Sequence, residues 1–318
     1  MSFVLTTELE RAAKYSLPQP LDSAVISALE HIRHGCFQRS LCFVVAVTSV
    51  ASGLEVGYEH YKGSYSNPVM YTPVGLSAAL VGSGLLGVMS RPGARVVLRA
   101  VSVLTLADGI IGFFFHVRGV ARKPGGWKLP VTNIVMGPPI FAPLLFGTSA
   151  YLGLMASYLR REEDLGRVMP SDIVMLSKSG WREDLRHGRF QKHLSTITIL
   201  WAFFSGFEAL YSHYKTNFRY KAQWTPVLLT PVLMAAAAGA IKSRRIANTL
   251  LPAVSTLALA DGAVGFYYHA RGIVRRPGGM KKPLYNMLYG PPIFAPLLFA
   301  ACGFLGLMAS LLRREKKG

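Results

Sequence analysis

The chain has 318 residues, of which 51% are hydrophobic and 16% charged, and its formal net charge at pH 7 is +19. So few charged residues cannot coat a water-soluble protein of this size, and several apolar runs reach the roughly 18 residues that a membrane helix requires. This composition excludes an ordinary soluble enzyme. Because the cations are divided among loops that flank the apolar runs, nucleic acid is not expected as a partner.

The first segments of the chain precede any apolar run. Residues 1–22 are polar and have no counterpart later in the chain, so we expect a loosely held N-terminal arm. Charged residues interrupt this stretch, and no cleavable signal peptide is expected. In residues 22–34, an apolar face formed by Val25, Ile26, Leu29 and Ile32 predicts a short helix lying at the membrane interface.

The apolar runs predict an all-α integral membrane protein with eight transmembrane helices. Only helices or closed barrels satisfy their backbone within hydrocarbon, and runs of this length fit helices. The expected spans are 41–58, 71–90, 96–117, 139–159, 194–211, 224–242, 249–270 and 292–312. Pro143 and Pro296, lying inside the fourth span of each set, are expected to bend its start.

One long motif occurs twice. LADGIIGFFFHVRGVARKPGGWKLPVTNIVMGPPIFAPLLF contains Asp108, and LADGAVGFYYHARGIVRRPGGMKKPLYNMLYGPPIFAPLLF contains Asp261, 153 residues later. The same offset relates residues from about 24 to 163 to the second part of the chain, which we call the first and second copy. We expect an arm (1–22), two four-helix modules (23–163 and 179–318) and a linker (164–178). An even number of spans per module predicts parallel repeats, related by a pseudo-two-fold axis along the membrane normal.

The loop cations set the expected orientation. The side that holds both termini carries more Lys and Arg, for example Arg91, Arg95, Arg160 and Arg161, although the opposite side is also basic. The positive-inside rule then predicts an integral protein of a bacterial inner membrane with both termini cytoplasmic. Cys36, Cys42 and Cys302 have no cysteine at their equivalent positions, so neither a disulfide framework nor a thiolate metal site is expected.

Ionisable side chains inside the apolar runs are the candidate site. A carboxylate within a membrane helix costs on the order of 2–3 kcal/mol or more and therefore needs a partner. Each copy supplies the same set in its non-cytoplasmic half, with histidines expected near the membrane edge and carboxylates deeper. The set is Glu55, His60, Asp108 and His116 in the first copy, and Glu208, His213, Asp261 and His269 in the second.

The leading hypothesis is that these residues bind metal and support a redox or electron-transfer role. Imidazole and carboxylate ligands together suit Fe, Cu, Zn or Mn, whereas haem is a weaker fit because the histidines lie at the rim. The Glu-x-x-His spacing of di-iron bundles is absent. Glu55 and His60 are about 140° apart on an ideal helix, so a shared site requires the helix to unwind near Gly57, or one of the two to point elsewhere.

Two alternatives use the same residues. A ladder of Asp, Glu and His is also how a transporter or a proton or ion path is lined. Alternatively, the protein is a structural membrane subunit in which the ladder only fixes helix register. The basic turns then hold an anionic lipid, an anionic substrate or an acidic partner, such as another subunit of a membrane complex. Their residues are Arg118, Arg122, Lys123, Arg271, Arg275 and Arg276.

The remaining motifs assign no reaction. No nucleotide-binding loop, hydrolase nucleophile elbow or zinc-finger spacing occurs in the sequence, and no known family is identified from the repeated motif. The sequence therefore predicts a membrane fold and a duplicated polar site, and leaves metal chemistry, transport and docking open.

Overall fold

The computed structural model describes residues 19–166 and 180–315, and within them the regular structure is helical, with no strand. The predicted arm falls largely in residues 1–18 and the predicted linker largely in 167–179, outside the described residues. In the first copy the long helices are α3 (Gln38–Lys62), α4 (Thr72–Met89), α5 (Arg99–Ala121) and α7 (Ala142–Ala156). In the second copy they are α10 (Gln191–Tyr214), α11 (Thr225–Lys242), α13 (Leu250–Val274) and α15 (Ala295–Leu311).

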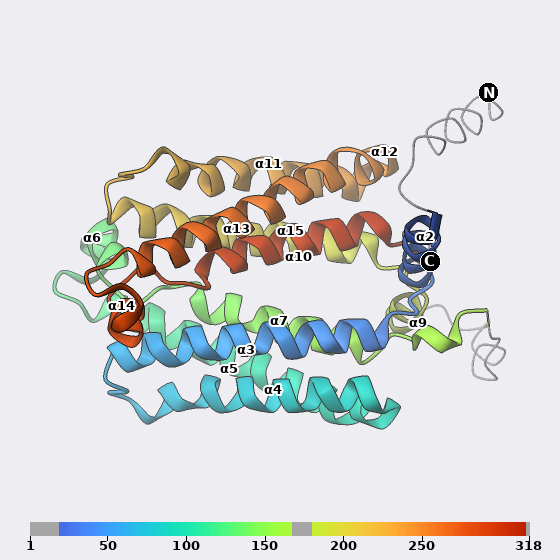
Figure 1. Cartoon of the computed structure of the whole chain (residues 1–318), viewed down its shortest axis with the longest axis horizontal. Helices are drawn as coiled ribbons and strands as arrows, with labels where there is room; N and C mark the ends of the chain where they lie inside the picture. Colours follow the sequence, from blue (N-terminus) through green and yellow to red (C-terminus); the bar gives the residue numbers. More distant parts are fainter. Residues whose placement is uncertain (1–18, 167–179, 316–318) are drawn as a thin grey trace.

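The helices run side by side, with those of the first copy on one side of the molecule and those of the second copy on the other (Figure 1). Short helices lie at the two ends. The end formed by α2 (Gln19–Arg33) and α9 (Trp181–Arg186) is called the α2/α9 end, and the opposite one, formed by α6 (Pro130–Val135) and α14 (Pro283–Leu288), is called the α6/α14 end. A π-helical turn (Gly93–Leu98) leads into α5, and α12 (Arg244–Asn248) precedes α13.

In the part of the chain that the structure describes, six helical segments are long and apolar enough to cross a membrane. They are Gln38–Lys62, Pro68–Met89, Gly93–Ala121, Gln191–Tyr214, Lys221–Lys242 and Leu250–Val274. Large apolar side chains such as Leu104 (60% exposed) and Ile110 (64%) project from them, as expected for surfaces that face lipid. The chain is therefore a polytopic, membrane-like helical protein.

The fourth helix of each copy is shorter than the sequence predicts. α7 has 15 residues and α15 has 17, so they are about 22 and 26 Å long, against about 30 Å of hydrocarbon. The expected starts at 139 and 292 are replaced by starts at Ala142 and Ala295. Consecutive prolines before these points disfavour helix, and Pro143 and Pro296 lie in the first turn, where they begin the helix without bending it.

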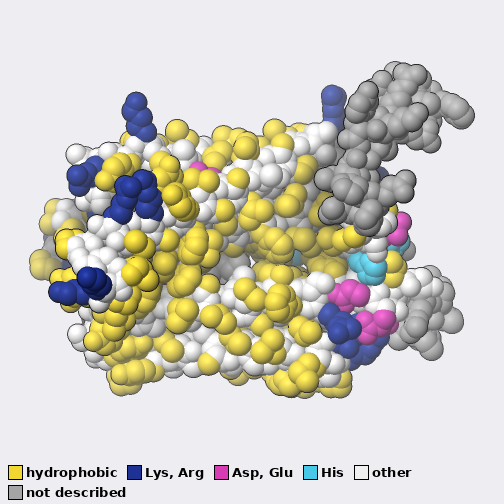
Figure 2. Space-filling view, in the orientation of Figure 1, with side chains coloured by type: hydrophobic (Ala, Val, Ile, Leu, Met, Phe, Trp, Pro, Cys, Tyr) yellow, Lys and Arg dark blue, Asp and Glu magenta, His cyan; other side chains and the backbone are white. Residues whose placement is uncertain are grey.

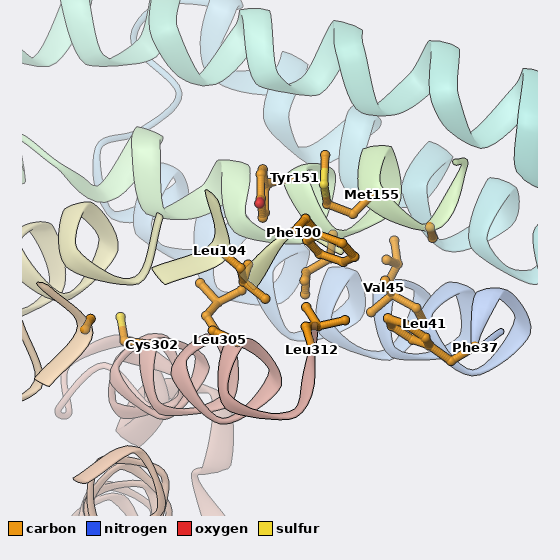
Figure 3. Packing of buried hydrophobic residues seen from close by; sticks show 14 of the residues in the cluster. Phe37, Leu41, Val45, Tyr151, Met155, Phe190, Leu194, Cys302, Leu305 and Leu312 are labelled. Carbon is orange, nitrogen blue, oxygen red and sulfur yellow. The ribbon is translucent and has the colours of Figure 1, made fainter. Parts of the chain in front are cut away.

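A continuous cluster of buried apolar residues joins the two copies toward the α2/α9 end. α3 and the residue before it contribute Phe37, Leu41 and Val45, and α7 contributes Tyr151 and Met155 (Figure 3). Phe190 and Leu194 of the second copy, with Leu305 and Leu312, complete the contact. The interface between the copies is thus packed by α7 against α10, and by the residues that precede α3 and α10.

Helix α2 has the amphipathic character that the sequence predicts. Val25 and Ile26 on its apolar face remain 48% and 58% exposed, whereas Ile32 packs against the core. A helix that keeps an apolar face exposed at the end of a bundle is suited to lie in the headgroup region of a bilayer. Its counterpart in the second copy, α9, is described only from Trp181 to Arg186.

Candidate functional site

The start of α7 is held by a carboxylate from the other copy. The first amides of a helix have no intrahelical acceptor, and here they follow a non-helical stretch that begins at Gly137. Glu208 of α10 reaches this point, and Phe141 N donates to its Oε1 at 2.5 Å. The amide of Ala142 also hydrogen-bonds this carboxylate, and the Tyr211 hydroxyl donates to Oε2. A deeply placed glutamate is thus satisfied by main-chain donors.

The equivalent contact runs in the opposite direction. Glu55 of α3 in the first copy accepts a hydrogen bond from Phe294 N, the amide at the start of α15 in the second copy, at 3.1 Å. A helix N-terminus carries a partial positive charge that favours a carboxylate. We call these two contacts, Glu55 with Phe294 and Glu208 with Phe141, the crossed caps. Each copy therefore holds the fourth helix of its neighbour.

Three of the four candidate histidines donate to main-chain carbonyl groups, and two of these carbonyls lie in the stretches that precede α7 and α15. His116 Nδ1 donates to Pro139 O at 2.5 Å, and His269 Nδ1 donates to Pro292 O at 2.6 Å. Because a carbonyl only accepts, Nδ1 is the protonated nitrogen in both rings. His60 Nδ1 donates in the same way to Met70 O at 2.7 Å, and the His213 ring lies 6.5 Å from that of His269.

Glycines on α5 let the proline-rich stretch approach closely enough for these bonds. A Cβ at Gly109 would lie 2.8 Å from Pro143 O, and one at Gly112 would lie 3.0 Å from Pro143 Cβ. The equivalent Gly262 and Gly265 of α13 are in similar contact with Pro296. Non-helical backbone at membrane depth is tolerated where protein covers it, and the glycines make this cover possible.

Asp108 and Asp261 lie away from the crossed caps. Thr72 at the start of α4 donates to Asp108 Oδ1 at 2.6 Å, and Thr225 makes the equivalent hydrogen bond to Asp261. Asp108 also lines an open groove between α4 and α5. Asp108 and His116 therefore have different partners, Thr72 for the first and the carbonyl of Pro139 for the second.

The predicted ladder is divided among separate contacts. α3 continues without a break to Lys62, so the unwinding near Gly57 that a shared site required does not occur. Glu55 and His60 instead point to different partners, as the second possibility allowed. Among residues 19–166 and 180–315, no group of three or more His, Cys, Asp or Glu side chains is placed to hold a metal ion. The cysteines Cys36, Cys42 and Cys302 are all buried.

The basic turns lie at the α6/α14 end, where Figure 2 shows Lys and Arg side chains beside hydrophobic ones. Asn133 Nδ2 donates to Pro124 O at 3.0 Å and Gly126 O at 2.7 Å, which fixes the Pro-Gly-Gly turn, and Asn286 does the same in the second copy. Arg118, Arg122, Arg271 and Arg275 are exposed, Lys123 and Arg276 are partly buried, and within the described chain none of the six forms an ion pair. The buried Arg276 Nε has no hydrogen-bond partner there.

A contact between the copies at the α2/α9 end was not predicted from the sequence. The backbones of Gly35 and Gly188 are in direct contact, because a Cβ at Gly35 would lie 2.6 Å from Gly188 N. Arg160 donates to His34 O at 2.7 Å and Arg313 to His187 O at 2.6 Å, while Arg313 Nε also reaches Arg33 O at 2.7 Å. These arginines obey the 153-residue offset, which is the signal that could have identified them.

Comparisons of the chain with protein-family models, with curated proteins and with solved structures find no match. The geometry of the crossed caps, the histidine contacts and the basic turns is therefore the basis for inferring a function.

Proposed function

We propose that the chain is a membrane transport protein that moves protons as its two copies shift against each other. In this proposal each copy is a four-helix module, the modules are parallel repeats, and all eight segments cross the bilayer. The short α7 and α15 complete their crossings with the non-helical stretch before them and with α6 and α14. Broken helices of this kind, near the interface between repeats, are a feature of many secondary transporters.

The observation that carries the proposal is the pair of crossed caps. Glu55 and Glu208 lie inside helices that are apolar enough to span a membrane, and both bond across the boundary between the copies. If such a carboxylate only fixed the register of its helix, a hydrogen-bond partner in its own copy would serve equally well. Placed across the boundary, its charge state controls how strongly the copies hold together.

Protonation of Glu55 and Glu208 changes the strength of the contact between the two copies. A hydrogen bond to a charged group contributes about 1.5–3 kcal/mol, against about 1 kcal/mol for a neutral pair. Neutralising both glutamates therefore weakens the contact by about 1–4 kcal/mol, and a change near 3 kcal/mol shifts a two-state equilibrium by about 150-fold. The copies contact chiefly through α10 against α7 and α6, and Figure 2 shows the surface hollowed near the middle of the molecule.

The test is proton flux in liposomes. Purified protein is reconstituted around a pH-sensitive dye, and an inward proton flow is driven by a potassium diffusion potential. The wild-type protein is expected to acidify the lumen, and the double variant Glu55→Gln/Glu208→Gln to do so at least about tenfold more slowly. Glutamine keeps an acceptor oxygen, so the fold is retained while the charge is lost.

The matched control for this test is Glu59→Gln. Glu59 is also on α3, but it pairs with Lys62 at 2.9 Å and has Ser212 at its equivalent position. The control is expected to retain wild-type flux. A wild-type flux no faster than that of protein-free vesicles, or a double variant as fast as the wild type, contradicts the proposal and favours the structural alternative.

Metal binding is a second, weaker candidate, and no step of the proposed transport uses a metal. It has one supporting observation: the Nδ1–H groups of His116 and His269 are fixed on carbonyls, which leaves each Nε2 with a lone pair. Among the described residues, no group of three or more His, Cys, Asp or Glu side chains is placed to hold a metal ion. Elemental analysis of the purified chain for Fe, Cu, Zn and Mn, with an absorption spectrum for haem, decides this candidate, since a stoichiometric metal would support it.

A further inference from the structure

The open groove between α4 and α5 lies outside the crossed caps and has a different chemical character. It is a shallow, open depression with a volume of about 490 Å³. Its walls are apolar and include Leu104 and Ile111, which are 60% and 50% exposed on the outer face of the bundle. The groove is therefore open to the hydrocarbon phase, and its occupant would enter from the membrane.

Two polar side chains lie in this apolar groove. The Thr72 hydroxyl lies 2.6 Å from Asp108 Oδ1 and 2.8 Å from Val69 O, so a single proton is shared between two acceptors. An ionised carboxylate has about four lone-pair positions. Within the described residues Thr72 is the one hydrogen-bond donor to Asp108, so most of the capacity of this carboxylate remains unused.

Among the residues that line the groove, the two copies differ at Gly75 and Ile111, and the larger change in side-chain size is at Gly75. Gly75 lines the groove, and a Cβ built on it meets no atom within 4 Å. The equivalent residue of the second copy is Leu228, whose side chain is 63% exposed. Asp261 and Thr225 are otherwise arranged as Asp108 and Thr72 are. A large side chain therefore projects from this position in the second copy alone, and we expect only the first copy to hold a ligand.

We propose that this groove binds a long-chain amine dissolved in the membrane, with its ammonium group on Asp108 and its chain along Leu104 and Ile111. A carboxylate that faces hydrocarbon is energetically unfavourable, and a cationic hydrogen-bond donor is the head group that offsets this cost most directly. An anionic amphiphile is repelled by the same charge. The site goes beyond the proton transport proposed above and does not depend on it.

Photo-cross-linking tests this assignment on the full chain in phosphatidylcholine nanodiscs. The probe is sphingosine, a long-chain amino alcohol, carrying a diazirine on its chain, and the comparison probe is palmitic acid with the same diazirine. The sphingosine probe is expected to label peptides of α4 and α5 saturably and to be displaced by unlabelled sphingosine. The fatty-acid probe is expected to label these peptides at least about tenfold less.

Variants locate the site and separate it from general contact with lipid. Asp108→Asn and Gly75→Leu are each expected to lower the labelling of α4 and α5 about tenfold, whereas Asp261→Asn leaves it unchanged. Leu228→Gly is expected to add labelling of α11 and α13. Each of three results would overturn the proposal. The two probes could label these peptides equally, unlabelled sphingosine could fail to displace the probe, or these peptides could be cross-linked to a second protein chain and not to the probe. The displacement measurement uses the wild-type chain, so the test stands even where a variant folds poorly.

Discussion

Gly35 and Gly188 are the residues at which the two copies approach most closely at the α2/α9 end. Gly35 has φ +70°, and a Cβ there would lie 2.5 Å from Arg186 O. Gly35→Ala is therefore expected to lower the free energy of unfolding by about 2–4 kcal/mol, from backbone strain and the clash together. Gly166→Ala is the control, because Gly166 has φ +77° with open space around it and should cost only about 1 kcal/mol. Equal losses in thermal unfolding would contradict this account.

Asp164 supports a prediction for acidic pH outside the membrane spans. Arg91 donates to both of its carboxylate oxygens, at 2.6 and 2.7 Å, and these bonds lower the pKa of Asp164. In the unfolded chain the Asp164 carboxyl has a pKa near 3.9, so between its folded and unfolded pKa values the unfolded chain binds more protons than the folded one. The stabilisation by the ion pair with Arg91 is therefore complete above about pH 4 and is lost as the pH falls through the folded pKa. Asp164→Asn is expected to remove this part of the acid dependence of unfolding.

Arg91 can be compared with its equivalent in the second copy. Arg91→Ala leaves a buried carboxylate without its cation and is expected to cost about 2–3 kcal/mol at pH 7, since Arg91 itself is partly exposed. Arg244 is the equivalent arginine, and the position equivalent to Asp164 is Lys317. Arg244→Ala should therefore change stability by less than about 0.5 kcal/mol. A similar loss in both variants would argue against the ion pair as the cause.

The sequence predicted the intramembrane carboxylates correctly as residues that need partners, but not which partners they have. Glu55 and Glu208 were expected near histidines or an ion, and they instead accept from main-chain amides of the other copy. A backbone N–H is present at almost every residue, so no residue type marks it as the partner. Thr72 and Arg160, in contrast, recur at the 153-residue offset, and that recurrence could have identified both.

At the scale of single elements, we propose that the basic turns form a surface that binds anionic lipid. Their cations stand beside exposed apolar residues such as Trp127 (49%) and Leu284 (64%), a combination suited to an anionic lipid leaflet. The variant Arg122→Ala/Lys123→Ala/Arg275→Ala/Arg276→Ala is expected to retain less phosphatidylglycerol in native mass spectrometry, at about 1 kcal/mol per cation.

The control for the basic turns lies at the other end of the bundle. Arg244→Ala/Arg245→Ala removes exposed cations there and should leave the retained phosphatidylglycerol nearly unchanged. If the turn variant retains as much of this lipid as the wild type, an acidic protein partner becomes the better explanation for the turns. Co-purification of another membrane subunit with the wild type alone would support that alternative.

Helix boundaries were predictable where hydropathy determines them. The six long helices begin and end within a few residues of the predicted spans, because apolar length alone fixes where a chain crosses hydrocarbon. The start of α7 was predicted three residues too early. Hydropathy continues through Pro138, Pro139 and Ile140, whereas the backbone there is non-helical, and its carbonyl and amide groups are satisfied by His116 and Glu208. Such long-range partners are not visible in a local pattern.

For the whole molecule, the repeat was the most informative feature of the sequence. It predicted which elements recur, and the structure places the recurring helices on opposite sides of the bundle (Figure 1). It did not predict how the copies meet. The copies bond to each other at both ends, through Gly35 and Gly188 at one and through the crossed caps at the other, and the second contact contains the two carboxylates that lie within apolar helices.

The most direct measurement is the distance between the copies at the α6/α14 end. Trp127 and Met280 are exposed and lie at equivalent positions, so spin labels attached to Trp127→Cys and Met280→Cys report this distance. It is measured by double electron–electron resonance in liposomes. A narrow distribution is expected at pH 7.5, and a longer or broader one at pH 5. Glu55→Gln/Glu208→Gln should give the pH 5 distribution at both pH values, and Glu59→Gln should behave as the wild type. A distribution that neither pH nor the double variant alters would contradict control of the two copies by the crossed caps.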